Sequence, residues 1–113
     1  MVQLEETFAA LADPTRRGIV SRLARGSATV SELVDCFELT QPTISSHLKV
    51  LERAGLVARS RVAQTRPCSL RPDGFRALEA WLGQLRATYE ANYARLDAVL
   101  EQLKNEEEGG PTP

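Results

Sequence analysis

The chain has 113 residues, enough for one domain with a modest core and too few for two. Hydrophobic residues make up 42% of the sequence, and the net charge is −1. There is no apolar stretch long enough to span a bilayer or to serve as the core of a signal peptide, so we expect a cytoplasmic protein. Two cysteines do not make a disulfide framework.

The net charge conceals a basic middle segment. Residues 43–76 carry seven basic and two acidic side chains, whereas residues 1–42 and 77–113 carry net charges of −2 and −4. A basic segment between acidic ends suits a surface that meets phosphates. Taken alone, the basic segment is equally consistent with a solvated charged face. Only a recognisable motif can distinguish that reading from a surface that binds phosphates.

Helix-start and helix-stop signals predict three helices in the first third of the chain. Apolar spacing over residues 2–11 predicts a first helix that ends before the Asp13-Pro14 pair. That pair combines a capping carboxylate with a proline at the first helical position, which predicts a second helix ending near Gly26. Thr29 followed by Glu32 is a capping-box pattern and predicts the third.

A fourth helix follows after a very short connection. Thr40 is its predicted N-cap, Gly55 ends it, and Ile44, Leu48 and Leu51 form its inward stripe. Two helices joined this tightly cannot lie as a long antiparallel pair. The layout is typical of a helix-turn-helix whose second, recognition helix covers Thr40–Arg53.

The pattern then changes to short strands. Residues 56–62 and 66–70 are predicted to pair around a tip at 63–65, and Pro67 indicates an edge strand or a poorly paired one. A hairpin directly after a recognition helix is a wing. The sequence Pro72-Asp73-Gly74 predicts that a helix begins again there.

The last helix has an apolar seam at alternating steps of three and four residues. Its length of about 30 residues corresponds to roughly 45 Å. Because so small a chain cannot cover that length, we expect the seam to bury against a second copy; an internal core helix is the alternative. The expected contacts along this seam are Leu78, Leu82, Leu85, Tyr89, Asn92 or Tyr93, Leu96, Val99 or Leu100, and Leu103.

The predicted fold is therefore mainly α-helical: a winged helix-turn-helix with a small β-hairpin and a long C-terminal dimerisation helix. We expect a DNA-binding and dimerisation domain over residues 1–104 and a disordered acidic tail over 105–113, since the tail is rich in Glu, Gly and Pro.

The outer face of the fourth helix has side chains of the types that contact bases and phosphates in duplex DNA. Short hydroxyl groups near a helix N-terminus suit close approach to a groove, a glutamine amide can pair with adenine, and cations further along suit phosphates. The expected contacts are Gln41, Thr43, Ser45, Ser46, Lys49 and Arg53 from the helix, with Arg59, Arg61, Gln64, Thr65 and Arg66 from the wing. We expect the wing tip to reach a neighbouring minor groove.

Three segments carry a resemblance to a known family. They are Leu11–Arg17, Ser31–Leu33 and the run from Gln41 to Val57, which reads QPTISSHLKVLERAGLV. Together they resemble the ArsR/SmtB family of winged-helix repressors over about residues 5–100. The resemblance implies a homodimer formed by the first and last helices, which adds Leu4 and Phe8 of the first helix to the expected dimer contacts. It further implies an operator with inverted half-sites and frequent repression of the regulator's own operon. It also implies that His47 faces DNA, although packing at the turn is a second role for this sole histidine.

The residues that usually bind a metal in this family are absent from the matching positions of this sequence. The family's Cys-x-Cys positions fall on Thr29 and Ser31, which are poor ligands for soft metals, and the last helix has no histidine or cysteine. We therefore expect no metal site and no cofactor. Cys36 and Cys68 leave a redox-responsive repressor as one alternative, with two small buried hydrophobic residues as the other reading.

Two other function classes fit the sequence less well. A winged helix used only as a protein-interaction module would not need the basic centre or the hydroxyl-lined face. An enzyme is disfavoured, because the sequence has a single histidine, no Gly-rich phosphate loop and no pairing of nucleophile with base.

Overall fold

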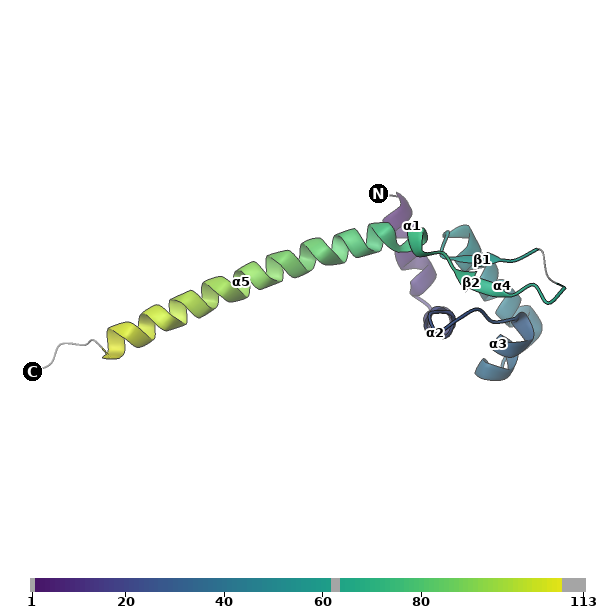
Figure 1. The fold of residues 1–113 in the computed structure, drawn as a ribbon, viewed down its shortest axis with the longest axis horizontal. Coiled ribbons are helices and arrows are strands. Elements are labelled where there is room, and N and C mark those ends of the chain that lie inside the picture. Colours follow the sequence, from purple (N-terminus) through teal and green to yellow (C-terminus); the bar gives the residue numbers. More distant parts are fainter. Residues whose placement is uncertain (1, 62–63, 109–113) are drawn as a thin grey trace, which may run out of the picture. The chain divides into compact units, whose positions relative to one another are not determined.

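A computed structural model describes residues 2–61 and 64–108. Contacts divide the chain between Leu78 and Glu79 into two units. The elements of the first unit, in chain order, are α1 (Val2–Leu11), α2 (Pro14–Leu23), α3 (Val30–Phe37), α4 (Gln41–Arg53), β1 (Val57–Arg59), β2 (Cys68–Leu70) and the 3₁₀ turn η1 (Pro72–Phe75) (Figure 1). The long helix α5 (Arg76–Glu108) begins at the end of the first unit and from Glu79 onward lies in the second. The predicted mainly helical winged helix-turn-helix with a long C-terminal helix is confirmed.

The predicted helix starts are confirmed by their hydrogen bonds. The Asp13 carboxylate accepts from the backbone N–H of Arg16 at 3.1 Å, with Pro14 at the first position of α2. Thr29 and Glu32 complete a reciprocal capping box at α3. These bonds satisfy amide groups that a helix cannot pair internally, so each helix begins at a position chosen by local chemistry.

The core of the first unit is built around α4. Its inward residues Ile44, Leu48 and Leu51 are fully buried and pack with side chains of α2, α3 and the segment after α4. The other members of the buried cluster are Ala10, Ile19, Leu23, Ala28, Leu33, Ala54, Leu56, Val57 and Cys68. Because the inward stripe of α4 is held on several sides, its outer face is presented at a fixed angle.

The chain approaches itself closely where α4 leads into the wing. Gly55 has φ +77°, a conformation that glycine adopts without a steric cost. Gly74 packs against it so tightly that an added Cβ would lie 2.0 Å from the Gly55 carbonyl oxygen. The Arg71 N–H also donates to the Leu56 carbonyl at 2.9 Å. These backbone contacts join the two ends of the hairpin to the end of α4.

The wing strands are shorter than predicted. β1 and β2 pair antiparallel with Val57 opposite Leu70 and Arg59 opposite Cys68, in place of the predicted 56–62 and 66–70. One further backbone bond joins the Ser60 N–H to the Pro67 carbonyl at 2.9 Å. Pro67 has no N–H to return that bond, which ends the ladder there. Residues 62 and 63 of the predicted strand and tip lie outside the described residues.

The other edge of β2 is also paired. Ala28 and Cys68 exchange two backbone hydrogen bonds of 3.0 and 2.7 Å in an antiparallel bridge. The segment before α3 therefore joins the wing sheet, and this bridge places Cys68 in the centre of the core. No sequence pattern predicted the bridge, because one isolated pair of residues needs no strand-length pattern.

Two boundaries of the last helix differ from the predictions. Residues 72–75 form a 3₁₀ turn and α5 begins only at Arg76. At the other end α5 continues to Glu108, so residues 105–108 are helical and were wrongly assigned to a disordered tail. Residues 109–113 of that tail lie outside the described residues. Every side chain from Glu79 to Glu107 is exposed. None of the helices in the described part of the chain is long and apolar enough to cross a membrane.

Candidate nucleic-acid interface

The turn between α3 and α4 is three residues long. Glu38 ends α3 in the left-handed conformation, with φ +54°, and Thr40 caps α4 by accepting from the Thr43 N–H at 3.4 Å. The Thr40 and Thr43 hydroxyls also lie 2.9 Å apart. The left-handed residue reverses the chain within one turn, and the cap begins the next helix at once. This is the predicted helix-turn-helix connection.

The outer face of α4 carries most of the predicted DNA contacts. Gln41, Thr43, Ser46, Lys49 and Arg53 are exposed. Ser45 is half-buried on the same helix. This face holds an amide and hydroxyl groups near the helix N-terminus and the two cations further along. That order places uncharged hydrogen-bonding groups at the end where the helix dipole is positive.

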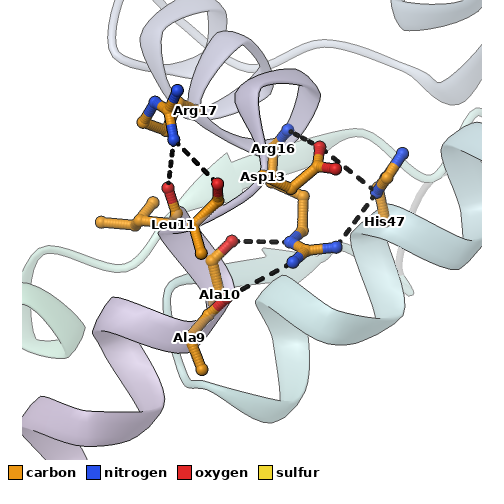
Figure 2. Close-up of polar contacts among 8 residues, drawn as sticks. Ala9, Ala10, Leu11, Asp13, Arg16, Arg17 and His47 are labelled. Carbon is orange, nitrogen blue, oxygen red and sulfur yellow. Dashed lines mark hydrogen bonds and ion pairs between the residues drawn. The ribbon is translucent and has the colours of Figure 1, made fainter.

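His47 is turned toward the corner between α1 and α2 (Figure 2). Its ring Nδ1 lies 3.4 Å from an Arg16 guanidinium nitrogen and 4.0 Å from the Asp13 carboxylate, and its side chain is 18% exposed. The Arg16 guanidinium donates further to the carbonyls of Ala10 at 2.6 Å and Ala9 at 3.3 Å. His47 therefore packs against the corner between α1 and α2 through Nδ1, and its expected contact with DNA stays a prediction.

This corner fixes the position of α4 relative to α1. The backbone N–H of Arg16 holds the pKa of the Asp13 carboxyl below its ordinary value of 3.8. Arg17 donates to the carbonyls of Leu11 and Ala12 at 2.8 and 3.0 Å, again at the end of α1. Two arginines of α2 thus satisfy the last carbonyls of α1, and one of them also reaches α4. No local sequence pattern predicted this meeting, since Arg16 and His47 are 31 positions apart.

The wing cations differ in their surroundings. Arg59 on β1 is half-buried and donates to the Glu52 carboxylate of α4 at 2.5 Å, so it joins the wing to the end of the recognition helix. Arg61 and Arg66 are exposed, as are Gln64 and Thr65 near the tip. Arg66 has φ +45°, an unusual conformation for a residue other than glycine.

A groove of about 590 Å³ lies between the end of α4 and the wing. Its described lining includes Lys49, Glu52, Val57, Ala58, Arg59, Ser60, Arg61, Arg66 and Arg71. Cations outnumber the single carboxylate in this lining, and that carboxylate is already paired with Arg59. Arg71 was missing from the predicted contacts. Arg71 could have been predicted as a contact, because it lies in the basic segment directly after the second strand.

The two cysteines are free thiols in different environments. Cys36 is exposed on α3, whereas Cys68 is fully buried on β2. Burial raises the pKa of the Cys68 thiol, which disfavours the reactive thiolate. Within residues 2–61 and 64–108, no group of three or more His, Cys, Asp or Glu side chains is arranged to hold a metal ion. Thr29 is committed to the α3 cap and Ser31 is exposed.

The residues of the predicted dimer seam lie on α1 and α5. Phe8 is exposed and Leu4 is half-buried on α1. Of the predicted seam residues on α5, Leu78 is half-buried. The exposed large apolar residues of this helix are Trp81, Leu82, Leu85, Tyr89, Tyr93, Leu96, Val99, Leu100 and Leu103. A helix with this much exposed apolar surface along one seam is typical of an association surface.

The fold and this surface define the class of winged helix-turn-helix DNA-binding proteins. The profile of the bacterial regulatory protein, arsR family, matches residues 13–59. A crystal structure of an ArsR family transcriptional regulator superposes with a TM-score of 0.69 at 41% identity, covering 78% of this chain and 97% of that one.

Two proteins with similar sequences are also transcriptional regulators. HTH-type transcriptional regulator Rv2034 of Mycobacterium tuberculosis is 39% identical over 81% of this chain and 86% of its own length. Transcriptional repressor SdpR of Bacillus subtilis is 34% identical over 54% of this chain and 68% of its own length. The chain belongs to the ArsR family of DNA-binding transcriptional regulators, and it is a regulator rather than an enzyme.

Proposed function

We propose that this chain is a cytoplasmic homodimeric repressor that binds an inverted-repeat operator, including that of its own gene. The observation that carries the proposal is the continuity of one surface. The exposed polar face of α4 adjoins the cationic groove that α4 forms with the wing. A duplex docked there meets hydrogen-bonding groups at the groove floor and cations along the backbone.

The position of each residue on the surface formed by α4 and the wing indicates which part of the DNA it contacts. Gln41, Thr43 and Ser46 lie at the N-terminal end of α4 and contact base edges, with Ser45 beside them. The exposed cations hold phosphates: Lys49, Arg53, Arg61, Arg66 and Arg71. Gln64 and Thr65 reach the adjoining minor groove.

Two residues expected to touch DNA have a different role in this proposal. His47 sets the angle of α4 through Arg16, and Arg59 fixes the wing to α4 through Glu52. Both act by positioning the reading surface, because His47 Nδ1 lies beside the Arg16 guanidinium and Arg59 Nε donates to the Glu52 carboxylate.

A homodimer supplies the second half-site contact. The apolar seam of α5 needs a partner, and a second copy gives the two-fold symmetry that an inverted repeat requires. Regulation does not pass through the family's usual Cys-x-Cys positions, since Thr29 and Ser31 present hydroxyl groups that bind soft metals weakly. Nor does it pass through a thiol pair, since Cys68 is enclosed in the core.

Selection of bound sequences from a random duplex pool by the purified protein tests this proposal. We expect an inverted repeat whose half-site centres are about one helical turn apart, roughly 34–36 Å. Ser46→Ala and Gln41→Ala should change the selected sequence, whereas Lys49→Ala should weaken binding to every duplex alike. Recovery of no enriched sequence, or unchanged selection by both α4 variants, would contradict the proposed reading surface.

A further inference from the structure

A second groove borders the recognition helix, between α1 and the last turns of α4. This α1–α4 groove lies within the first unit and has a volume of about 380 Å³. It shares no lining residue with the cationic groove beside the wing. Its described lining is Glu6, Ala9, Ala10, Arg16, Val50, Arg53 and Ala54. Pockets for small organic molecules have volumes from about 300 Å³ upward, so this groove has room for a small ligand.

The floor of the α1–α4 groove is apolar. Ala10 and Ala54 are buried, Val50 is half-buried, and the exposed Ala9 adds a methyl group at the rim. Methyl groups offer no hydrogen bond and favour a ligand by contact and by the release of water from apolar surface. An occupant of this groove therefore needs an apolar body.

Two arginines border this apolar floor. The Arg16 guanidinium donates to two carbonyls at the end of α1 and lies beside His47 Nδ1 (Figure 2). These contacts use three of its five N–H groups and leave two. Arg53 is exposed, and no hydrogen bond or ion pair among the described residues involves its side chain. Glu6 is the one acidic residue in the described lining, so the groove carries a net positive charge and suits a carboxylate.

We infer that the α1–α4 groove binds a small carboxylic acid with an aliphatic body, and that this acid lowers the affinity of the protein for DNA. The inference rests on the DNA-binding surface proposed above, because Arg53 belongs both to that surface and to this groove. A carboxylate bound to Arg53 neutralises a cation that would otherwise contact a phosphate. By thermodynamic linkage, DNA weakens the binding of the acid by the same factor.

Arg16 connects the groove to a second point on the recognition helix. Its guanidinium lies 3.4 Å from His47 Nδ1 and donates to the Ala10 carbonyl at 2.6 Å, so it holds α4 to the end of α1. A carboxylate in the groove competes for the same guanidinium. The acid therefore acts on α4 directly at Arg53 and through Arg16 at His47.

The α1–α4 groove stays accessible in the proposed dimer. Leu4 and Phe8 are the expected dimer contacts of α1, and each stands two positions before a residue of the groove, Glu6 or Ala10. Because a helix has 3.6 residues per turn, a separation of two positions places side chains on nearly opposite faces. A second copy packed on Leu4 and Phe8 therefore leaves the groove open to a ligand.

Methyl NMR of the full chain, labelled at alanine and valine, tests the site with isocaproate as the probe. Isocaproamide has the same carbon skeleton without the charge and is the matched control ligand. We expect isocaproate to shift the methyl signals of Ala9, Ala10, Val50 and Ala54, and isocaproamide to shift them far less, because the arginines hold only the charged group strongly. Equal shifts with both compounds, or no shift of these four residues, would overturn the inference.

Glu6 and Glu5 offer a matched pair of variants. Both are exposed on α1, but only Glu6 lines the groove. Glu6→Gln removes a negative charge beside the bound carboxylate and should tighten isocaproate binding roughly 2- to 5-fold, whereas Glu5→Gln should leave it unchanged. Ala9→Leu should fill the groove and abolish binding. Equal effects of the two glutamine variants, or full isocaproate binding by Ala9→Leu, would show that the acid binds elsewhere.

Fluorescence anisotropy with the selected operator duplex measures the effect on DNA binding. Saturating isocaproate should lower operator affinity relative to an equal concentration of acetate, which keeps the ionic strength and lacks the apolar body. The slope of log affinity against log salt should become less steep by about 1.8, because each of the two protomers loses one phosphate contact. Ala9→Leu should bind the operator like the wild type and ignore the acid.

The outcomes separate the two proposals. Isocaproate that binds the groove but leaves operator affinity and salt slope unchanged would overturn its regulatory role. Failure of the wild-type protein to bind any operator without acid would instead contradict the proposed function, whatever the NMR shifts show at the groove.

Discussion

In the proposed complex, alanine at Arg61 removes a phosphate contact whose effect can be calculated. The proposed dimer has two copies of this exposed wing residue, so the variant is expected to lose two contacts. Each neutralised phosphate contributes about −0.9 to the slope of log affinity against log salt, so the slope should become less steep by about 1.8. Raising the salt from about 50 to about 200 mM should then reduce the ratio of wild-type to variant affinity about tenfold.

Fluorescence anisotropy of a labelled duplex, measured across that salt range, gives the slope directly. Arg25→Ala is the matched control: it removes an exposed arginine that lies outside the basic segment and away from the groove. Its slope should equal that of the wild type. The docking model is refuted if Arg61→Ala keeps the wild-type slope, or if both variants flatten it equally.

Three smaller predictions concern the fold. Gly74→Ala should lower the free energy of unfolding by about 3 kcal/mol in denaturant titrations, because its Cβ would lie 2.0 Å from a carbonyl oxygen; a wild-type midpoint would contradict that packing. The Arg16 N–H lowers the Asp13 pKa, so this carboxylate stabilises the fold at neutral pH and the contribution is lost as pH falls through the lowered pKa. Asp13→Asn should therefore lose less stability than wild type between about pH 5 and pH 3, and equal losses would refute the linkage. An alkylating reagent should label Cys36 in the folded protein and reach Cys68 only after denaturation; rapid native labelling of both would show that Cys68 is accessible.

Local chemistry explains how much of the fold was predictable. Asp13, Thr29 and Thr40 cap their helices through bonds to residues three positions on, so each start could be read from a short segment. The inward stripe of α4 follows from helical periodicity. The wing strands were predicted too long: the ladder extends beyond β1 and β2 only by the bond from the Ser60 N–H to the Pro67 carbonyl, because Pro67 has no N–H to continue it.

The order of elements, the helix caps, the basic segment and the spacing along α5 could all be predicted from the sequence, since each depends on neighbours within a few residues. How distant groups meet depends on the packing of the whole fold. That packing brought His47 to Arg16 and Asp13, enclosed Cys68 beside Ala28, and gathered Arg71 into the groove with Lys49. Periodicity specifies which face of a helix turns inward, but the partner on that face is set by how all the buried surfaces pack together.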